Sequence, residues 1–234
     1  KLLAATGNDS LALTEMQKAI SLDSTKAGEV YTELADWAGK KKDYAGVISF
    51  LQKKKKATGS LTNNDWFDLG KAYYWSGQGK LREASDLAAE YKKKKKPEGP
   101  DAIAARKQSD SLFVLADSAF VNLAALNPSW PVSHVWRGRA NAMIDPEAST
   151  DSTKMHYEKV LSLLKPEDLK GSYKNYAVEA YEYLGYYYVK KKDEAKAKET
   201  WLKVKDLEPN NENAKFYLNP PKQKAQAGQK TQAK

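Results

Sequence analysis

The sequence has no cysteine, little arginine and histidine, and no long uninterrupted hydrophobic run. Without cysteine, the chain cannot form a disulfide, a thiolate zinc site or a cysteine nucleophile. No apolar run reaches the length of about 18 residues that predicts a membrane-spanning helix, so no membrane insertion of this fragment is expected. The 234 residues, of which 41% are hydrophobic, are nevertheless enough to build a core.

Lysine supplies nearly all of the positive charge. The formal net charge is +9, and the lysines gather in runs at residues 40–42, 53–56, 92–96 and 190–192. Surfaces that bind nucleic acid usually use the planar guanidinium group of arginine, so no nucleic-acid partner is expected. The runs fall where helices should end, a position in which cations complement the helix dipole.

One segment, Val178 to Asn211, has the pattern of a helix, a turn and a second helix. Leu184, Gly185 and Tyr188 share the first helix, and Ala197, Trp201 and Val204 recur at helical spacing on the second. Gly185 and Ala197 are small, so two antiparallel helices can approach closely there. Pro209 prevents the second helix from continuing.

This unit resembles the tetratricopeptide repeat, whose pattern of aromatic, Leu-Gly, Tyr, Ala, aromatic, small residue and Pro over about 34 residues it matches at nearly every position. The resemblance implies an all-α fold, a right-handed superhelical solenoid of antiparallel helix pairs. It also implies a non-enzymatic scaffold that binds proteins.

Small residues recur in phase with Gly185. Ala35, Gly70, Ala104 and Gly138 follow one another at steps of 35, 34 and 34 residues, and Gly185 comes 47 residues later. The phase predicts about five repeats: 28–61, 63–96, 97–130, 131–166 and 178–211. In the second repeat, a turn is expected around Gly77-Gln78-Gly79.

The third repeat, 97–130, leaves two interpretations open. Its second helix carries Ala116, Phe120 and Leu123 at the expected spacing, but its first helix would be only residues 102–108. Either the repeat is degenerate, which the retained phase favours, or residues from about 77 to 110 are an insertion. The insertion would split one repeat whose first helix is residues 64–75.

The two ends of the chain do not form complete repeats. Residues 1–24 are interpreted as a truncated N-terminal repeat that retains mainly its second helix. A short helix at 212–218 should cap the last repeat, since terminal repeats need protection from water. The tail 219–234, rich in Lys, Gln and Ala, lacks apolar periodicity and is expected to be disordered.

The sequence contains no recognisable catalytic or metal-binding motif. The two histidines, His134 and His156, do not belong to a metal-spaced pair; His134 is expected to pack structurally and His156 to lie on the surface. No phosphate-binding glycine loop occurs. No cofactor, metal, catalytic residue or small-molecule substrate is therefore expected.

In the tetratricopeptide family, the first helices line a concave surface. The resemblance assigns partner binding to polar and aromatic residues near the small position of each first helix: Glu29, Asp36, Lys40, Asn64, Lys71, Tyr74, Trp75, Arg139, Glu179, Tyr186 and Lys190. Packing against a neighbouring repeat is the alternative role for Tyr74 and Trp75. Of Arg137 and Arg139, one is expected to pair with a partner carboxylate or with an internal one.

The predicted function is to hold a peptide or helix of a partner protein in a concave groove. The alternative is self-association, as an assembly module of a larger cell-envelope or secretion complex, and RNA binding is a less favoured third hypothesis. The protein is expected to be a monomer or weak dimer. Because the composition is similar to that of Lys- and Tyr-rich repeat proteins of the Bacteroidetes, the expected location is the bacterial periplasm or cell envelope, with the cytoplasm as the alternative.

Overall fold

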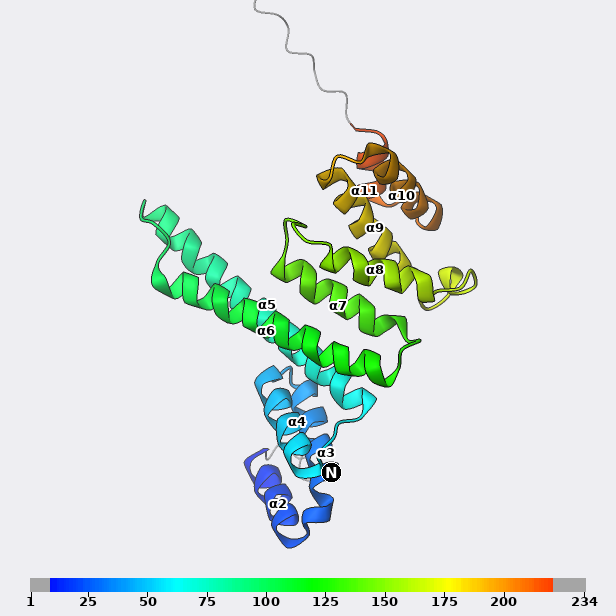
Figure 1. Cartoon of the computed structure of the whole chain (residues 1–234). Coiled ribbons are helices and arrows are strands. Elements are labelled where there is room, and N and C mark those ends of the chain that lie inside the picture. The colour runs from blue at the N-terminus through cyan, green and yellow to red at the C-terminus, as the bar shows by residue number, and fades with distance from the viewer. Residues whose placement is uncertain (1–8, 221–234) are drawn as a thin grey trace, which may run out of the picture. The chain divides into compact units, whose positions relative to one another are not determined.

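The computed structural model describes residues 9–220, and this range is helical without a strand (Figure 1). The predicted all-α class is therefore confirmed. The contacts divide the chain into two compact units, with the boundary between Leu163 and Leu164. Unit 1 and unit 2 are described separately.

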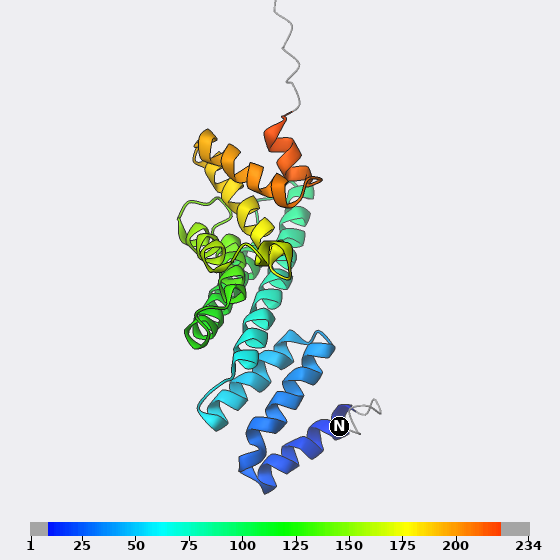
Figure 2. The same cartoon turned by 90° about the vertical axis from the view of Figure 1, so that its right-hand side faces the viewer.

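Unit 1 begins with three short helices. They are α2 (Asp9–Leu22), α3 (Ala27–Lys40) and α4 (Tyr44–Thr58), with a 3-10 turn, η1 (Ser24–Lys26), before α3. Figure 2 shows them following one another in antiparallel fashion. The α3–α4 pair occupies the first predicted repeat, and α2 lies where the second helix of the truncated repeat was expected. Residues 1–8 of that repeat lie outside the described residues.

Two long antiparallel helices follow, α5 (Asn63–Lys93) and α6 (Pro100–Leu126). The turn predicted at Gly77-Gln78-Gly79 is wrong, because α5 continues through these residues. Gly77 is buried, and a Cβ atom there would lie 3.0 Å from the ring of Phe113 on α6. The carbonyl of Gly77 accepts a hydrogen bond of 2.9 Å from the Ser109 hydroxyl. The glycine therefore permits close helix packing.

The α5–α6 pair corrects the predicted division into repeats 63–96 and 97–130. A Cβ atom at Gly70 would lie 2.6 Å from the ring of Phe120, so these two residues form the small-to-aromatic contact of a single repeat. Ala104, the predicted in-phase residue of a separate repeat, is exposed on α6. The insertion interpretation describes the structure better, and the joined ends of α5 and α6 project beyond α7 (Pro131–Ile144) in Figure 1.

A buried ion pair between α4 and α5 also holds a side chain of α3. The Nζ atom of Lys54 on α4 lies 2.6 Å from the carboxylate of Asp65 on α5 and 2.6 Å from the hydroxyl of Thr32 on α3. Asp65 also closes a capping box with Thr62 at the start of α5. Burial raises the pKa of Asp65, but the hydrogen bonds from Lys54 and Thr62 outweigh it and hold the pKa below its usual value.

The last pair of unit 1 is α7 and α8 (Ser152–Leu163). Gly138 on α7 faces the Tyr157 ring on α8, as the repeat pattern predicts. In the loop between them, the Asp145 carboxylate accepts hydrogen bonds from the backbone of Thr150 and Ser149 and from the Thr150 hydroxyl, which lowers the pKa of Asp145 to about 2.

Unit 2 contains a 3-10 turn, η2 (Asp168–Lys170), and the helices α9 (Lys174–Lys190), α10 (Glu194–Leu207) and α11 (Glu212–Leu218). In its core, Trp201, Val204 and Ala214 pack together with Val178. The indole of Trp201 would be 2.5 Å from a Cβ atom at Gly185, so only glycine fits there without a shift. Helix α11 spans the residues of the predicted cap, and of the predicted disordered tail only Asn219 and Pro220 fall within the described residues.

Two of the lysine-rich turns have the same backbone conformation. Lys42 and Lys192 have positive φ angles of 58° and 60°. The next residues, Asp43 and Asp193, each donate a backbone hydrogen bond of 2.9 Å to a carbonyl five residues earlier. This is a Schellman helix end, in which lysine occupies the place that glycine usually takes.

Among the described residues, α6 is the one helix that is long and apolar enough to cross a membrane, judged by length and composition alone. The most apolar 18-residue window of α6 has a mean hydropathy of 1.3, and 33% of this window is buried within the protein. Core helices of soluble proteins meet the same criterion. Here α6 packs along α5 and against α7.

Candidate functional site

The first helices of the repeats in unit 1 lie next to one another. Phe67 on α5 contacts Trp136 on α7 with ring centroids 6.1 Å apart. On the other side of α5, the carboxylate of Asp36 on α3 is close enough to raise the pKa of Asp68. Helix α3, the first half of α5 and α7 therefore form one face.

Aromatic residues dominate the α5–α7 part of this face. Trp136 stacks on Phe120 at 5.6 Å with an interplanar angle of 22°. The edges of other rings surround it; their centroids lie 5.3 to 6.4 Å from that of Trp136, at Tyr74, Phe67 and Trp75. Edge-to-face contacts of this kind stabilise a cluster beyond its apolar burial.

Two cations lie over this cluster. The Lys71 Nζ atom is 4.8 Å from the ring centroid of Phe67, and the Arg139 guanidinium carbon is 4.6 Å from that of Trp136. Trp75 remains 42% exposed. We name Phe67, Lys71, Trp75, Trp136 and Arg139 the aromatic–cation surface.

Helical spacing explains why these side chains meet. Phe67, Lys71 and Trp75 follow at intervals of four on α5, so they share one side of the helix. Trp136 and Arg139 are three residues apart on α7 and share a side in the same way. The packing of Gly70 against Phe120 fixes α5 on α6, and α7 packs against α6.

Asp68 gives this face a carboxylate that is costly to ionise. Burial raises the pKa of Asp68, and the carboxylates of Asp36 and Asp65 add to the effect, while Lys71 acts in the opposite direction. The Lys71 Nζ atom lies 3.5 Å from the Asp68 carboxylate, and both side chains are more than a third exposed. Pairs of this kind contribute little to stability, so Lys71 can exchange Asp68 for a partner carboxylate.

The structure contradicts one predicted binding residue of unit 1. Tyr74 is buried, 8% exposed, and its ring packs at 5.4 Å against Phe113 and 5.3 Å against Trp136. The alternative role of Tyr74, packing against the neighbouring repeat, is therefore the one observed. Trp75 instead has a ring contact with Trp136 and an exposed remainder.

The other predicted residues of unit 1 lie on α3, α5 and α7, the first helices of their repeats. Exposed side chains are those of Glu29, Asp36 and Lys40 on α3 and Asn64 on α5. Half-buried ones are Lys71 and Arg139. Only Lys71, Trp75 and Arg139 of this set are brought together at the aromatic cluster.

Three predicted residues belong to unit 2, on α9. Glu179 and Tyr186 are half-buried and Lys190 is exposed, with its Nζ atom 5.6 Å from the Tyr186 ring centroid. They form a separate set from those of unit 1.

Arg137 and the histidines have structural surroundings. The Nε atom of Arg137 donates a hydrogen bond of 2.8 Å to Asp117 on α6, which is the internal pairing expected for one of the two arginines. The prediction that His156 lies on the surface is wrong, because only 9% of it is exposed and its ring lies 6.1 Å from that of His134. Burial lowers the pKa of His156 to about 4, and burial also lowers the pKa of His134.

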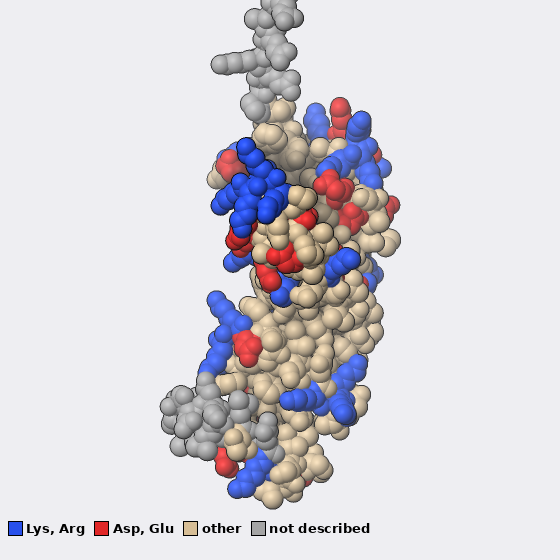
Figure 3. Space-filling view, turned by 90° about the vertical axis from the view of Figure 1, so that its left-hand side faces the viewer, with Lys and Arg blue, Asp and Glu red and all other residues tan. Residues whose placement is uncertain are grey.

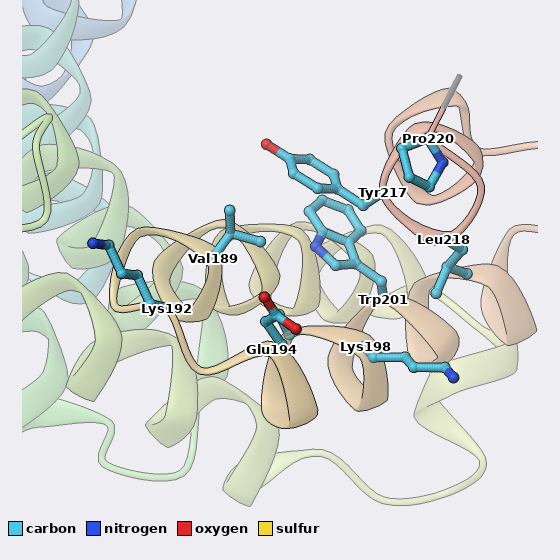
Figure 4. Close-up of a pocket in the computed structure, with 9 residues that line it drawn as sticks. Val189, Lys192, Glu194, Lys198, Trp201, Tyr217, Leu218 and Pro220 are labelled. Atoms are coloured by element: carbon cyan, nitrogen blue, oxygen red, sulfur yellow. The ribbon is translucent and has the colours of Figure 1, made fainter. Parts of the chain in front are cut away.

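Unit 2 has a pocket of about 590 Å³ at the end of α11 (Figure 4). The rings of Trp201 and Tyr217 stack at 4.6 Å with an interplanar angle of 12° and form one wall. Val189 and Lys192 lie at the opposite end, beside Glu194. The Nε1 atom of Trp201 is buried without a hydrogen-bond partner and is sealed against Gly185, so it cannot serve a ligand. The described residues contain no cluster of His, Cys, Asp and Glu that could hold a metal ion.

Sequence reasoning missed Phe67, Asp68 and Trp136 as members of the candidate site. Phe67 and Trp136 are packing residues of their repeats, and their spacing to Lys71 and Arg139 was the available signal for a shared cation–aromatic face. Asp68 carried no signal, because its raised pKa depends on partial burial and on Asp36 of α3 lying near α5.

Solved structures of TPR proteins are among those similar to this chain. The C-terminal part of a TPR repeat-containing protein from Cytophaga hutchinsonii is 28% identical, with a TM-score of 0.68, over 92% of this chain and 69% of that one. A thermophilic TPR protein from Thermus thermophilus is 18% identical with a TM-score of 0.45, over 92% of both chains. The Cut9–Hcn1 hetero-tetramer of the APC/C gives 14% identity and a TM-score of 0.37, over 92% of this chain and 40% of that one.

Neither a protein-family model nor a curated protein sequence matches the chain. The similarity to the Cytophaga protein agrees with the resemblance to repeat proteins of the Bacteroidetes. The antiparallel helix pairs, the small-to-aromatic contacts at Gly70, Gly138 and Gly185, and this similarity together lead to one assignment. The chain has the helical repeat fold of the tetratricopeptide repeat proteins and is similar to them, and proteins of this kind are in general protein–protein interaction scaffolds.

Proposed function

We propose that this chain is a non-enzymatic scaffold that binds an acidic peptide or helix of a partner protein on the aromatic–cation surface of unit 1. The observation that carries the proposal is the exposed part of Trp75. Its ring contacts that of Trp136, which Arg139 covers, and Trp75 follows Lys71 by one turn of α5. Tryptophan and arginine are the residue types most enriched among those that dominate binding energy at protein interfaces.

The chemistry of the surface favours a mixed ligand. An apolar or aromatic side chain of the partner would cover Trp75 and displace water from it. A carboxylate of the partner would pair with Lys71 or with the planar fork of Arg139. Because both cations already lie over rings, their positions are restricted before binding, which reduces the entropy lost on association.

Charge-reversal variants test this surface. Wild-type protein, Lys71→Glu, Arg139→Glu and Trp75→Ala would be immobilised, and proteins captured from a lysate of the source bacterium at physiological salt would be identified by mass spectrometry. The purified partner would then be titrated against each variant. We expect the titration to show at least about a tenfold loss of affinity for each variant.

Lys80→Glu on the same helix is the matched control, because Lys80 pairs with Glu83 away from the aromatic cluster. It should retain the partner. Equal binding by the wild type and all three surface variants would show that the aromatic–cation surface is not the binding site. Recovery of nucleic acid alone would favour the less expected RNA-binding function.

Self-association in an assembly of the cell envelope is the alternative function. It predicts a dimer whose population rises with concentration and falls in the Trp75→Ala variant. Sedimentation velocity across a hundredfold concentration range would separate it from binding by a monomeric scaffold.

A further inference from the structure

The outer face of α6 has no charge over four turns. Between Ser111 and Leu126, every exposed residue is uncharged, and the larger apolar ones are Val114, Leu115, Val121 and Leu126, with exposures of 51%, 44%, 42% and 55%. The only charged residue of this segment is Asp117, which pairs with Arg137 on α7. In a chain with 29% charged residues, such a face is unusual. Figure 3 shows a broad area of unit 1 without charged side chains, with lysine and arginine at its margins.

The polar residues of this face direct their donors back to their own helix. The hydroxyls of Ser111 and Ser118 donate to carbonyls four residues earlier at 2.9 Å, and the Asn122 amide does the same at 2.8 Å. Both hydroxyl protons and one of the two Asn122 amide protons are therefore already bonded within the helix. The face presents mainly carbon atoms to whatever covers it.

A hollow of about 370 Å³ continues the face at its C-terminal end. Asn122, Ala125 and Leu126 of α6 form one side of it, and Leu61 and Trp66 form the other. Lys55 lies at the same hollow, with its Nζ atom 4.9 Å from the Trp66 ring centroid. The hollow is large enough for one bulky apolar side chain, and Lys55 adds a positive charge beside it.

We propose that the outer face of α6 binds an amphipathic helix of a partner protein, with an acidic residue of that helix at Lys55. Ser118, Val121 and Ala125, following Val114, recur at alternating steps of four and three, which is the spacing of a helix-packing seam. The small residues leave shallow positions for the side chains of a second helix. The segment Ser111–Leu126 is about 23 Å long, which corresponds to a partner helix of about 16 residues.

The positive charge of Lys55 favours a partner helix with an acidic residue over a second copy of this chain. The same face of another copy has no carboxylate between Ser111 and Leu126 except Asp117, which is already paired. A second copy seated through this face would therefore leave Lys55 without a counter-charge from that face. An acidic residue on a partner helix supplies one.

The probe is a fluorescent 18-residue helical peptide with leucine along one stripe and glutamate beside it, titrated against the full chain by anisotropy. A second peptide has lysine in place of each glutamate. We expect the acidic peptide to bind and the basic peptide to bind at least about tenfold more weakly. Val121→Asp and Val114→Lys should each weaken binding of the acidic peptide about tenfold.

Lys55→Glu should reduce binding of the acidic peptide and improve that of the basic one, whereas Lys53→Glu, whose ammonium lies over Phe50, should change neither. Leu202→Asp on α10, where Leu202 is 41% exposed, controls for a general loss of surface hydrophobicity. Circular dichroism verifies the fold of each variant. Val114 and Val121 are both substantially exposed, so both variants should fold.

Three results would overturn the proposal. Equal binding of the two peptides, or an equal effect of Leu202→Asp and Val121→Asp, would remove the specific site. A wild-type dimer that Val121→Asp abolishes would assign the face to a second copy. Flotation with phosphatidylglycerol vesicles that Val121→Asp abolishes, without peptide binding, would assign it to a membrane surface. Because Trp75→Ala leaves this face intact, failure here is separable from failure of the aromatic–cation surface.

Discussion

At the scale of single residues, buried charge has the largest expected effect. Lys54 and Asp65 have side-chain exposures of 11% and 4% and bond to each other, and Lys54 also bonds to Thr32. Removal of one partner leaves the other charge buried without compensation, whereas the intact pair adds less net stability than its geometry suggests.

Asp65→Asn should lower the free energy of unfolding by about 3–5 kcal/mol. Urea denaturation at pH 7 measures it, with Asp86→Asn, an exposed position on the same helix, as the control. Because the folded pKa of Asp65 lies below the unfolded one, its contribution is present above about pH 4 and is lost as the pH falls through the folded pKa. A loss of less than about 1 kcal/mol would show that Lys54 finds another partner or moves to water.

His156 predicts a second pH dependence, at higher pH. Burial lowers the pKa of His156 to about 4, with Arg137 and His134 acting in the same direction and Asp117 in the opposite one. The unfolded chain, with a pKa of about 6.5, therefore binds more protons between these values, and stability falls as the pH drops from about 6.5 to 4. The loss should be about 3 kcal/mol.

Denaturation midpoints at pH 7.5, 6, 5 and 4.5 measure this slope. His156→Gln should flatten it, and NMR titration of the imidazole gives the folded pKa directly. A His156 signal that titrates near pH 6.5 would contradict the assignment. His134→Gln should flatten the slope less, because His134 is half-buried rather than buried.

At the scale of helices, glycine has opposite roles within α5. Gly70 faces the ring of Phe120, with only 2.6 Å available to a Cβ atom, whereas Gly79 has no atom within 4 Å. Gly70→Ala should destabilise the protein by about 1–3 kcal/mol through overpacking. Gly79→Ala should stabilise it by about 0.5–1 kcal/mol, because alanine favours a helix. Thermal melts of both variants test whether α5 is continuous, since a turn at residues 77–79 would not be stabilised by alanine.

The lysine turns allow a matched pair of substitutions at the end of α9. Lys192 has a φ of 60°, a conformation in which a side chain adds strain, whereas Lys191 has a φ of −80°. Lys192→Gly should raise stability by about 1 kcal/mol, while Lys191→Gly should lower it by a few tenths. The order of the two melting temperatures checks the backbone assignment, and a reversed order would refute it.

At the scale of the whole molecule, the division into two units predicts where a perturbation stops. Gly185→Ala forces Trp201 to move within the core of unit 2. Hydrogen exchange should therefore accelerate in α9, α10 and α11 and remain unchanged in α3 and α7. Equal acceleration in both units would show that they unfold as one cooperative body.

The sequence determined the helix pairs wherever a repeat has its standard length. Val178–Asn211 was recognised because Gly185, Trp201 and Pro209 each have a local reason for their type, and the same logic located α3–α4, α7–α8 and the cap at α11. The resemblance to tetratricopeptide repeats also predicted Lys71, Trp75 and Arg139 as partner-binding residues, and their role in binding stays a prediction.

Only the tertiary structure decided what depends on contacts between distant residues. Gly77 signals a turn in sequence, yet the ring of Phe113, 36 positions later, makes it a packing glycine, and two predicted repeats become one long pair. Tyr74 and Trp75 are adjacent in sequence, but the position of Trp136 buries the first and leaves the second partly exposed. Likewise, the sequence of α6 has the pattern of a repeat helix. Its uncharged outer face becomes evident only in the structure, where α5 and α7 cover its other sides. Periodicity specifies which residues share a side of a helix, whereas burial depends on which helix covers that side.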